Sequence, residues 1–297
     1  MKTAFRRLVR FKTSEGKIKY GEAPSEGASV GDVIKTYNGT FPWELEPSDE
    51  QAVVGEILCP LASTPIFYGI GLNYKGHIAE AKLDVPPFPT VFTKPPGKLS
   101  IQPYFARLKS NQEGIVGALA GPYDHVHVDP ACQFLDHERE LAFIVGKDVR
   151  NCSSAENSVE DNLLGSSVGN DVSSRYWQMP ERSGGQHGYA KSFDQFGPIG
   201  PVIVSTSEIP DPRLDLKTTL NGEERQNSNT GGLLSTIPQI LERLSRRTTL
   251  REGTVVMTGT PSGVAAFSKP PAWLKDGDMV EIKIRQIGKI RDKTVIG

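Results

Sequence analysis

Short apolar runs, separated by segments rich in glycine and proline, make up most of the hydrophobic pattern of this chain. Runs of this length are typical of strands rather than helices. The runs that we assign to strands are 66–71, 90–93, 141–145, 202–204, 255–257 and 279–284. Two segments have helical composition, 74–83 and 236–244. Many short strands, with 22 prolines and 30 glycines, favour a β-rich α+β fold over a doubly wound α/β sheet.

The first 60 residues predict a separate β-rich unit. Apolar positions in 5–11 lead through the turn 14–16 into 18–20, which is the pattern of a β-hairpin. Three arginines precede the first acidic residue, as they do in transit peptides, but the hairpin pattern indicates folded structure. We therefore expect a small N-terminal β-rich domain, residues 1–60, and a catalytic domain, residues 61–297.

Charge and cysteine content restrict the partners and the compartment. The 34 basic and 35 acidic side chains give a net charge of −1, so neither nucleic acid nor a membrane surface is expected as the main partner. The three cysteines show no C-x-x-C spacing, which favours a reducing compartment, and we predict a cytoplasmic protein. Function is therefore expected in a local site for a small molecule.

The strongest local signal of chemistry is Glu138-Arg139-Glu140, directly before the apolar strand 141–145. Residues i and i+2 of a strand project from the same face, so the two glutamates point the same way. Two adjacent buried carboxylates repel each other and lose hydration, and a hard cation such as Mg²⁺ or Mn²⁺ relieves both costs. A solvated strand end, with Arg139 as a salt-bridge partner, is the alternative interpretation.

Asp171 is the third candidate carboxylate. It follows 163–170, a run of small and apolar residues that is able to pack closely on the glutamate strand. The commoner role of an Asn-Asp pair is in a turn or a helix cap, so a metal site here depends on that packing. Three acidic ligands would leave coordination positions for water and substrate.

His77 and Glu80 form a second constellation. At i and i+3 of a helix they lie on one face, close enough for the carboxylate to orient the imidazole. A histidine held in this way is a suitable general base for water near neutral pH. A solvated surface pair is the alternative, but the pair follows the glycine turn at the end of strand 66–71, where active-site residues are expected.

Two lysines and one turn complete the candidate site. Lys94 and Lys191 stand beside apolar residues, where an ammonium group can neutralise an oxyanion or a carboxylate, although a single such lysine is usually a surface charge. The turn 258–263 follows strand 255–257, and its amides and hydroxyls are able to cradle an anion, although most such turns only reverse the chain.

Three patterns suggest other chemistry and are set aside. Gly165–Gly169 fits the G-x-S-x-G elbow of serine hydrolases, but the one later histidine, His187, follows too soon for the usual order. Gly69-Ile70-Gly71 lacks the further glycine spacing of a dinucleotide loop. His125 and His127 offer zinc two nitrogens without an evident third ligand, so a surface strand is expected.

The order of the motifs along the chain resembles the fumarylacetoacetate hydrolase family. The series comprises Asn73-Tyr74 with His77 and Glu80, Phe92–Pro95, Asp136–Leu141, Asn170–Arg175 with Gln178, Lys191–Asp194, Phe196–Pro198 and Thr258–Pro261. The resemblance covers residues 66–290, and 8–11 with 20–22 resembles the small N-terminal domain of that family. Such an ordered series is far more specific than any of its parts.

The resemblance implies a fold, a cofactor and roles for residues. The implied fold is a mixed β-sandwich roll with a small N-terminal β-rich domain, and the implied assembly is a homodimer. Mg²⁺ or Mn²⁺ would be held by Glu138, Glu140 and Asp171. The implied catalytic residues are His77 and Glu80, on a lid that orders over the substrate, and Lys191. The implied substrate-binding residues are Lys94, Arg175, Gln178, Thr258, Gly259 and Thr260.

The resemblance is to the shorter, acylpyruvase-like branch, and it predicts hydrolysis of a C–C bond in an acylpyruvate-like 2,4-dioxo acid. Oxaloacetate decarboxylation, oxo-acid tautomerisation and hydrolysis of a β-diketone of specialised metabolism are the alternatives on the same site. A ligand-binding scaffold is the non-enzymatic alternative. Three departures affect the pocket rather than the catalytic groups: His137, Ala265-Ala266 and a polar segment of about 99–117 that we expect to be an inserted loop.

Overall fold

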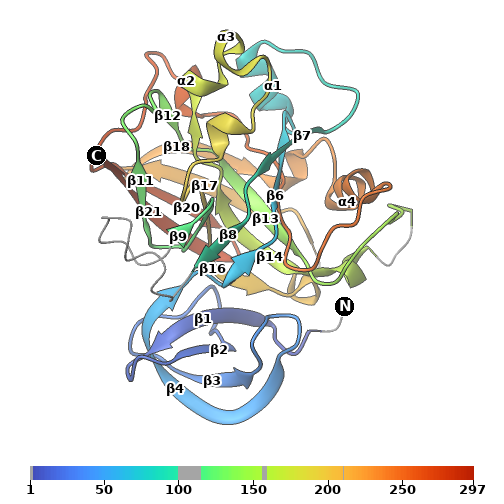
Figure 1. Cartoon of the computed structure of the whole chain (residues 1–297), viewed down its shortest axis with the longest axis vertical. Helices are drawn as coiled ribbons and strands as arrows, with labels where there is room; N and C mark the ends of the chain where they lie inside the picture. Colours follow the sequence, from blue (N-terminus) through green and yellow to red (C-terminus); the bar gives the residue numbers. More distant parts are fainter. Residues whose placement is uncertain (1–2, 100–114, 156–158, 210) are drawn as a thin grey trace.

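The computed structural model describes residues 3–99, 115–155, 159–209 and 211–297, and in these residues two large sheets form the fold. The larger has eleven strands (Figure 1). Its order is β2 (Ile18–Glu22), β3 (Val33–Asn38), β4 (Glu46–Leu58), β1 (Arg7–Thr13), β16 (Gly197–Val204), β14 (Leu163–Asn170), β13 (Arg139–Val145), β19 (Val255–Met257), β6 (Phe67–Gly71) and β7 (Thr90–Lys94), with β10 (Leu119–Ala120) paired to β16.

The second sheet has five strands, in the order β11 (His125–Val128), β21 (Gly288–Ile296), β20 (Met279–Ile284), β17 (Asp215–Leu220) and β18 (Glu223–Asn229). Two small sheets join β12 (Leu135–Asp136) to β15 (Ser173–Ser174), and β5 (Ser63–Thr64) to β8 (Gly97–Leu99) and β9 (Ile115–Val116).

A hydrophobic core fills the space between the two large sheets. Phe11 and Val202 from the first sheet belong to the same buried cluster as Ile282 and Ile290 from the second. Facing sheets that bury alternate residues of each strand between them form a β-sandwich. The predicted β-rich α+β fold, a mixed β-sandwich roll, is therefore confirmed.

Strand β13 runs through the middle of the larger sheet. All seven of its residues are buried, because helix α4 (Ile237–Ser245) packs on the face of Phe143 and Val145, and a second buried cluster covers the face of Ala142 and Ile144. Ile240 and Leu241 of α4 share a buried cluster with Phe143 and Val145 of β13. This burial on both faces accounts for the uninterrupted apolar run that follows Glu140.

The N-terminal strands β1–β4 lie at one end of the molecule (Figure 1). The predicted hairpin is confirmed, with Lys12 of β1 opposite Ile18 of β2. Strand β1 also pairs with β16, where Arg7 lies opposite Val204, so the N-terminal strands continue the larger sheet. The division at residue 60 stays a prediction, although β4 ends close to it, at Leu58.

Several elements differ from those expected. Strands β3 and β4 were not foreseen, because their sequences are mostly polar and exposed. The ends of the expected loop at 99–117 belong to paired strands β8 and β9, while 100–114 lie outside the described residues. Helix α1 (Lys75–Ala81) is shorter than 74–83 because Lys82 takes a left-handed conformation, with φ of 56°, and ends it. Short helices α2 (Arg175–Gln178) and α3 (Pro180–Ser183) were also not foreseen.

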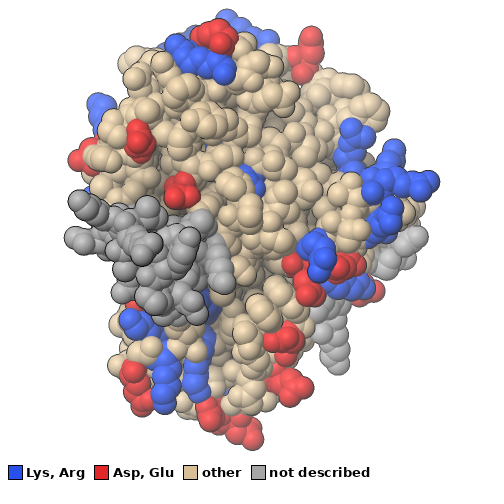
Figure 2. Space-filling model, in the orientation of Figure 1, with Lys and Arg blue, Asp and Glu red and all other residues tan. Residues whose placement is uncertain are grey.

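The patterns set aside above have structural roles here. Ser167 is buried within β14 and donates to the carbonyl of Val202, so no nucleophile elbow exists at this position. His125 and His127 lie exposed on β11, at the edge of the second sheet. Charged side chains lie mainly around the rim of the face in Figure 2. None of the helices in the described ranges is long and apolar enough to cross a membrane.

Candidate metal centre and catalytic pocket

Three carboxylates meet where strand β13 begins and the neighbouring antiparallel strand β14 ends. Glu140 lies in β13, Glu138 directly precedes that strand, and Asp171 directly follows β14. The antiparallel register sets Arg139 opposite Asn170, and the amide of Asp171 donates to the carbonyl of Glu138 at 2.8 Å. One carboxylate oxygen from each of the three acids lies within 4.8 Å of the others. We call Glu138, Glu140 and Asp171 the carboxylate cluster.

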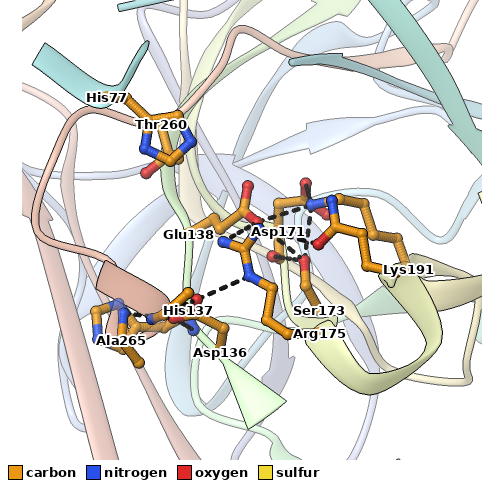
Figure 3. A network of polar contacts seen from close by, with 12 residues as sticks. His77, Asp136, His137, Glu138, Asp171, Ser173, Arg175, Lys191, Thr260 and Ala265 are labelled. Carbon is orange, nitrogen blue, oxygen red and sulfur yellow. Dashed lines mark hydrogen bonds and ion pairs between the residues drawn. The ribbon is translucent and has the colours of Figure 1, made fainter. Parts of the chain in front are cut away.

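Two lysines contact Asp171, one at each of its carboxylate oxygens. The Nζ of Lys191, from the 3₁₀ turn Tyr189–Lys191, lies 2.6 Å from Oδ2 of Asp171, 2.9 Å from Oε1 of Glu138 and 2.7 Å from Oγ of Ser173. The Nζ of Lys94 lies 2.6 Å from Oδ1 of Asp171 and donates to main-chain carbonyls. Both lysines are buried, and the carboxylates beside them compensate their charges. Figure 3 shows Lys191 beside Asp171.

Arg175 supplies a third cation and is itself held in place. Its NH2 lies 2.7 Å from Oε1 of Glu138, and its Nε donates to Oδ2 of Asp136 at 2.8 Å. Asp136 also accepts the main-chain amides of Ala265 and Ala266, at 2.7 and 3.1 Å. Asp136 thereby ties the arginine to the segment that forms the opposite wall of the site (Figure 3).

The two glutamates differ in electrostatic environment. Burial alone would raise the pKa of Glu138, but Lys191 and then Arg175 counter it, and the net result is a pKa below the ordinary range. For Glu140, burial and the neighbouring charges of Asp171 and Glu138 raise the pKa well above the ordinary range. The amide of Gly259, which donates to Oε2 of Glu140 at 2.6 Å, compensates only part of this. Glu140 thus lacks sufficient positive charge nearby.

A divalent cation fits this set of donors. The contacts of Glu138 with Lys191, Arg175 and Ser173 all reach Oε1, and Gly259 reaches Oε2 of Glu140. Within the described ranges, the other oxygen of each glutamate accepts no hydrogen bond. Carboxylate oxygens are the ligands that Mg²⁺ and Mn²⁺ prefer, and a cation beside Glu140 would remove its charge deficit.

His77 and Glu80 meet as their spacing predicts. Nδ1 of His77 lies 2.7 Å from Oε1 of Glu80, and Oε2 of Glu80 accepts the amide of Gly263 at 3.0 Å. The ring of Phe267 packs against His77 edge-on, with centroids 5.8 Å apart. Since Glu80 occupies Nδ1, Nε2 is the nitrogen left for proton transfer. Figure 3 shows His77 and Thr260 on one side of the carboxylate cluster.

One segment, 258–267, connects these parts. It supplies the amide of Gly259 to Glu140, that of Gly263 to Glu80, and two amides to Asp136. Gly259 has a φ of 104°, and a side chain there would meet Cβ of Asn73 at 2.8 Å, so glycine is required. The side chain of Gln226 holds the segment by donating to Thr260 and to the carbonyl of Pro261.

A cavity of about 440 Å³ opens beside the cluster. The predicted site residues that line it are His77, Glu138, Arg175, Gln178, Lys191 and Thr260. The others lie behind this surface and contact the cluster or the pair: Glu80, Lys94, Glu140, Asp171 and Gly259. Thr258 is buried and donates to the carbonyl of Leu141, so its contact is with β13. The roles assigned to these residues stay predictions.

Sequence reasoning did not assign four residues that the structure brings into the site. Ser173 donates to Glu138, Asp136 holds Arg175, Gly263 holds Glu80, and His187 lines the cavity beside Gln178, its Nδ1 3.2 Å from Nε2 of Gln178. Ser173 lies two residues after Asp171, which was the one local signal available. The contacts of Asp136 with Arg175 and of Gly263 with Glu80 join segments far apart in the chain and leave no local pattern.

Comparison with known proteins agrees with the fold. Residues 66–295 match the family described as fumarylacetoacetate (FAA) hydrolase C-terminal. The chain belongs to the fumarylacetoacetate hydrolase family. Members of this family act as hydrolases, isomerases or tautomerases, and the coarse assignment of an enzyme of this kind follows.

Individual relatives span all three activities by name. The chain is 34% identical over 240 residues to oxaloacetate tautomerase fahd2, mitochondrial, of Xenopus laevis, covering 80% of this chain and 68% of that protein. The structure of a 2-hydroxyhepta-2,4-diene-1,7-dioate isomerase from Mycobacterium marinum has a TM-score of 0.76, 27% identity, and 98% of each chain covered. A fumarylacetoacetate hydrolase from Exiguobacterium antarcticum has a TM-score of 0.73 and 26% identity, covering 98% of this chain and 99% of that one.

Proposed function

We propose that this chain is a divalent-metal-dependent hydrolase that cleaves a C–C bond in an acylpyruvate-like 2,4-dioxo acid. The observation that carries the proposal is the oriented histidine beside the carboxylate cluster. His77 and Glu138 line one cavity, and Glu80 fixes the imidazole at 2.7 Å. Hydrolysis needs a base that deprotonates water, and a carboxylate-oriented imidazole is suited to this step.

Water adds to the 4-carbonyl carbon, the C3–C4 bond breaks, and the products are a carboxylic acid and pyruvate. Nε2 of His77 takes the proton from water, and Glu80 stabilises the imidazolium that forms. Lys191 contributes the positive charge of its ammonium group near the oxyanion, and its N–H groups, which donate to Glu138, Asp171 and Ser173, hold that charge in place. A Mg²⁺ or Mn²⁺ ion held by the carboxylate cluster would supply the further charge that stabilises an enolate.

Oxaloacetate tautomerisation is the second candidate, because the Xenopus laevis relative carries that name at 34% identity. It needs proton transfer at C3 but no attacking water. Decarboxylation of oxaloacetate likewise needs no activated water, and a β-diketone of specialised metabolism remains an alternative substrate for hydrolysis. The homodimer and the cytoplasmic location also stay predictions.

Incubation of the protein with Mg²⁺ and a small panel of acids tests the proposal. Pyruvate should be released from acetylpyruvate or a longer acylpyruvate, the release should stop with EDTA, and excess Mg²⁺ or Mn²⁺ should restore it. Ultraviolet absorbance reports enol–keto interconversion of oxaloacetate in parallel. Interconversion without pyruvate release from any dioxo acid would replace hydrolysis by tautomerisation, and full activity in EDTA would remove the metal from the proposal.

A further inference from the structure

The cavity beside the carboxylate cluster changes character from its inner to its outer part. The inner part holds the charged and titratable residues Glu138, Lys191 and His77, which are buried beside the apolar side chains of Ile70 and Phe92. The outer wall is apolar and is formed by α1, the segment after it, the α2–α3 junction and the turn Ala265–Phe267. The outer residues that matter here are Leu72, Ala81, Leu83, Met179, Pro180 and Phe267. Helices α1, α2 and α3 lie together at one end of the molecule (Figure 1).

Among the described residues, no lysine or arginine lines the outer part of the cavity; Lys82, between Ala81 and Leu83, is exposed and is not part of the lining. The two cations that line the cavity, Lys191 and Arg175, both contact Glu138 at its inner end. Arg182 reaches the outer wall, where its NH1 donates to Sδ of Met179 at 2.7 Å, but the same guanidinium stacks 3.9 Å above the ring of Tyr176 and pairs with Glu181 at 3.0 Å. A second carboxylate at the far end of a substrate would therefore lose its hydration without gaining a cationic partner from the residues that line the cavity.

The outer wall also leaves apolar surface in water. Leu83 is 54% exposed and Phe267 is 37% exposed, although both line the cavity. Exposed apolar side chains that line a concavity indicate a binding surface for an apolar group. A cavity of 440 Å³ equals the liquid volume of roughly fifteen waters at about 30 Å³ each, so a four-carbon acid would leave much of it to water.

We propose that the acyl end of the substrate is an uncharged apolar chain, and that Leu83 is a specificity-determining residue for it. The inference deepens the proposed function, on which it rests for the chemistry at the acid end. The carboxylate and 2-oxo groups occupy the polar inner part, and the acyl chain extends past Leu83 and Phe267. Each methylene removed from water should tighten binding about fourfold.

Binding of uncleavable 2-oxo acids tests this without any turnover. Calorimetry with Mg²⁺ present should give rising affinity from 2-oxobutanoate through 2-oxohexanoate to 2-oxooctanoate. The matched diacid, 2-oxooctanedioate, should bind at least about tenfold more weakly than 2-oxooctanoate, because its second carboxylate loses hydration. Equal affinity along the series, or no measurable binding of 2-oxooctanoate, would overturn the inference.

Two arginine variants sharpen the test. Leu83→Arg should weaken binding of 2-oxooctanoate and tighten binding of the diacid, because it places a cation on the outer wall. Val85→Arg is the matched control, since Val85 is 57% exposed two residues further on and does not line the cavity; it should change neither affinity. Equal effects of the two variants would remove Leu83 from the specificity site.

The variant Arg182→Gln shows which residue is responsible if the diacid binds more tightly than 2-oxooctanoate. If the diacid binds more tightly and Arg182→Gln removes that gain, Arg182 receives the second carboxylate and the inference is wrong. Chain-length-dependent binding without pyruvate release from any dioxo acid would leave this inference standing and contradict the proposed function. The two failures are therefore separable.

Discussion

The carboxylate cluster and the His77–Glu80 pair border the same cavity, but the chain builds them in different ways. Neighbouring strands β13 and β14 fix the cluster, since their hydrogen-bonded register sets the carboxylates side by side. The pair stands on the seven-residue helix α1 and depends on one amide, that of Gly263, and on the ring of Phe267. Short helices with few buried contacts open more readily than a central strand.

This difference implies that metal binding and proton transfer are separable. Removal of a group from the strand-built cluster should affect both, because the metal is needed for the chemistry. Removal of a group from the helix-built pair should affect proton transfer alone. The following predictions test this separation, from the largest expected effect to the smallest.

Asp171→Asn should abolish metal binding and activity together. The variant keeps the size of the side chain but removes the charge that faces both Lys94 and Lys191, and it leaves two carboxylates near three cations. Even the loss of groups behind metal ligands costs about 10–100-fold in affinity, so we expect a loss of at least about 100-fold for Mg²⁺ by calorimetry. Asp211→Asn, at an exposed pair with Arg213, is the control. Unchanged affinity would mean that the metal binds elsewhere.

His77→Ala should lower C–C hydrolysis by about 100-fold or more, the usual scale for loss of a general base. Affinity for Mg²⁺ should stay unchanged, because His77 is not a proposed ligand. Decarboxylation of oxaloacetate should fall much less, since no water attacks. Steady-state kinetics on an acylpyruvate and on oxaloacetate measure both, and His125→Ala on the exposed strand β11 is the matched control.

Glu80→Gln should also lower C–C hydrolysis, but less than His77→Ala does. The glutamine amide still reaches the imidazole, and only the negative charge that stabilises the protonated imidazole is lost. Hydrolysis that survives His77→Ala would remove the base assignment. Decarboxylation that falls in parallel with hydrolysis would show that the histidine has a positional role in the site instead.

The pH dependence of the stability of the metal-free protein should show that ionisation of Glu140 is unfavourable in the folded chain. Burial, and then Asp171 and Glu138, raise the pKa of Glu140, so the folded chain keeps its proton at a pH where the unfolded chain has lost it. The stability from this group is present below the ordinary value of 4.5 and is lost as pH rises through the folded-state pKa. In EDTA, the free energy of unfolding by urea should therefore fall more steeply with pH in the wild type than in Glu140→Gln. Parallel profiles, like those expected for the exposed Glu181→Gln, would mean that Glu140 ionises without cost.

The contrast between the two regions also explains what the sequence can predict. Strand alternation at Glu138 and Glu140, and a small-residue strand before Asp171, are local signals, and both led to the cluster. Helical spacing likewise led to the pair of His77 and Glu80. These inferences work because each depends on periodicity within one element.

The supporting contacts have no such periodicity. Gly263 reaches Glu80, and Ala265 reaches Asp136, across long sequence separations. Both contacts use main-chain amides, which carry no sequence identity. Lys94 does not line the cavity, and its Nζ lies 2.6 Å from Oδ1 of Asp171, so a contact with the substrate stays a prediction. The polar strands β3 and β4 were missed for a related reason, since their pairing partners and not their own pattern make them strands.

Arg139→Met tests the same strand from its other side, where we expect the smallest effect. Arg139 stands between two proposed metal ligands, yet its NH1 donates to the carbonyl of Gln226 at 3.0 Å, away from the cluster. It is fully buried, its Nε and NH2 have no hydrogen-bond partner in the described part of the chain, and burial lowers its pKa to about 10. Replacement of a poorly paired buried charge by a hydrophobic side chain is often neutral or stabilising.

The free energy of unfolding by urea should therefore stay constant in Arg139→Met or rise by up to about 2 kcal/mol, with Mg²⁺ affinity unchanged. Arg175→Met, the equivalent change on the cavity side, should alter Mg²⁺ affinity because it frees Glu138 from an ion pair. A loss of stability beyond about 2 kcal/mol in Arg139→Met would show that the buried guanidinium makes stabilising contacts inside the fold. The two faces of β13 would then both depend on compensated charges, contrary to the prediction.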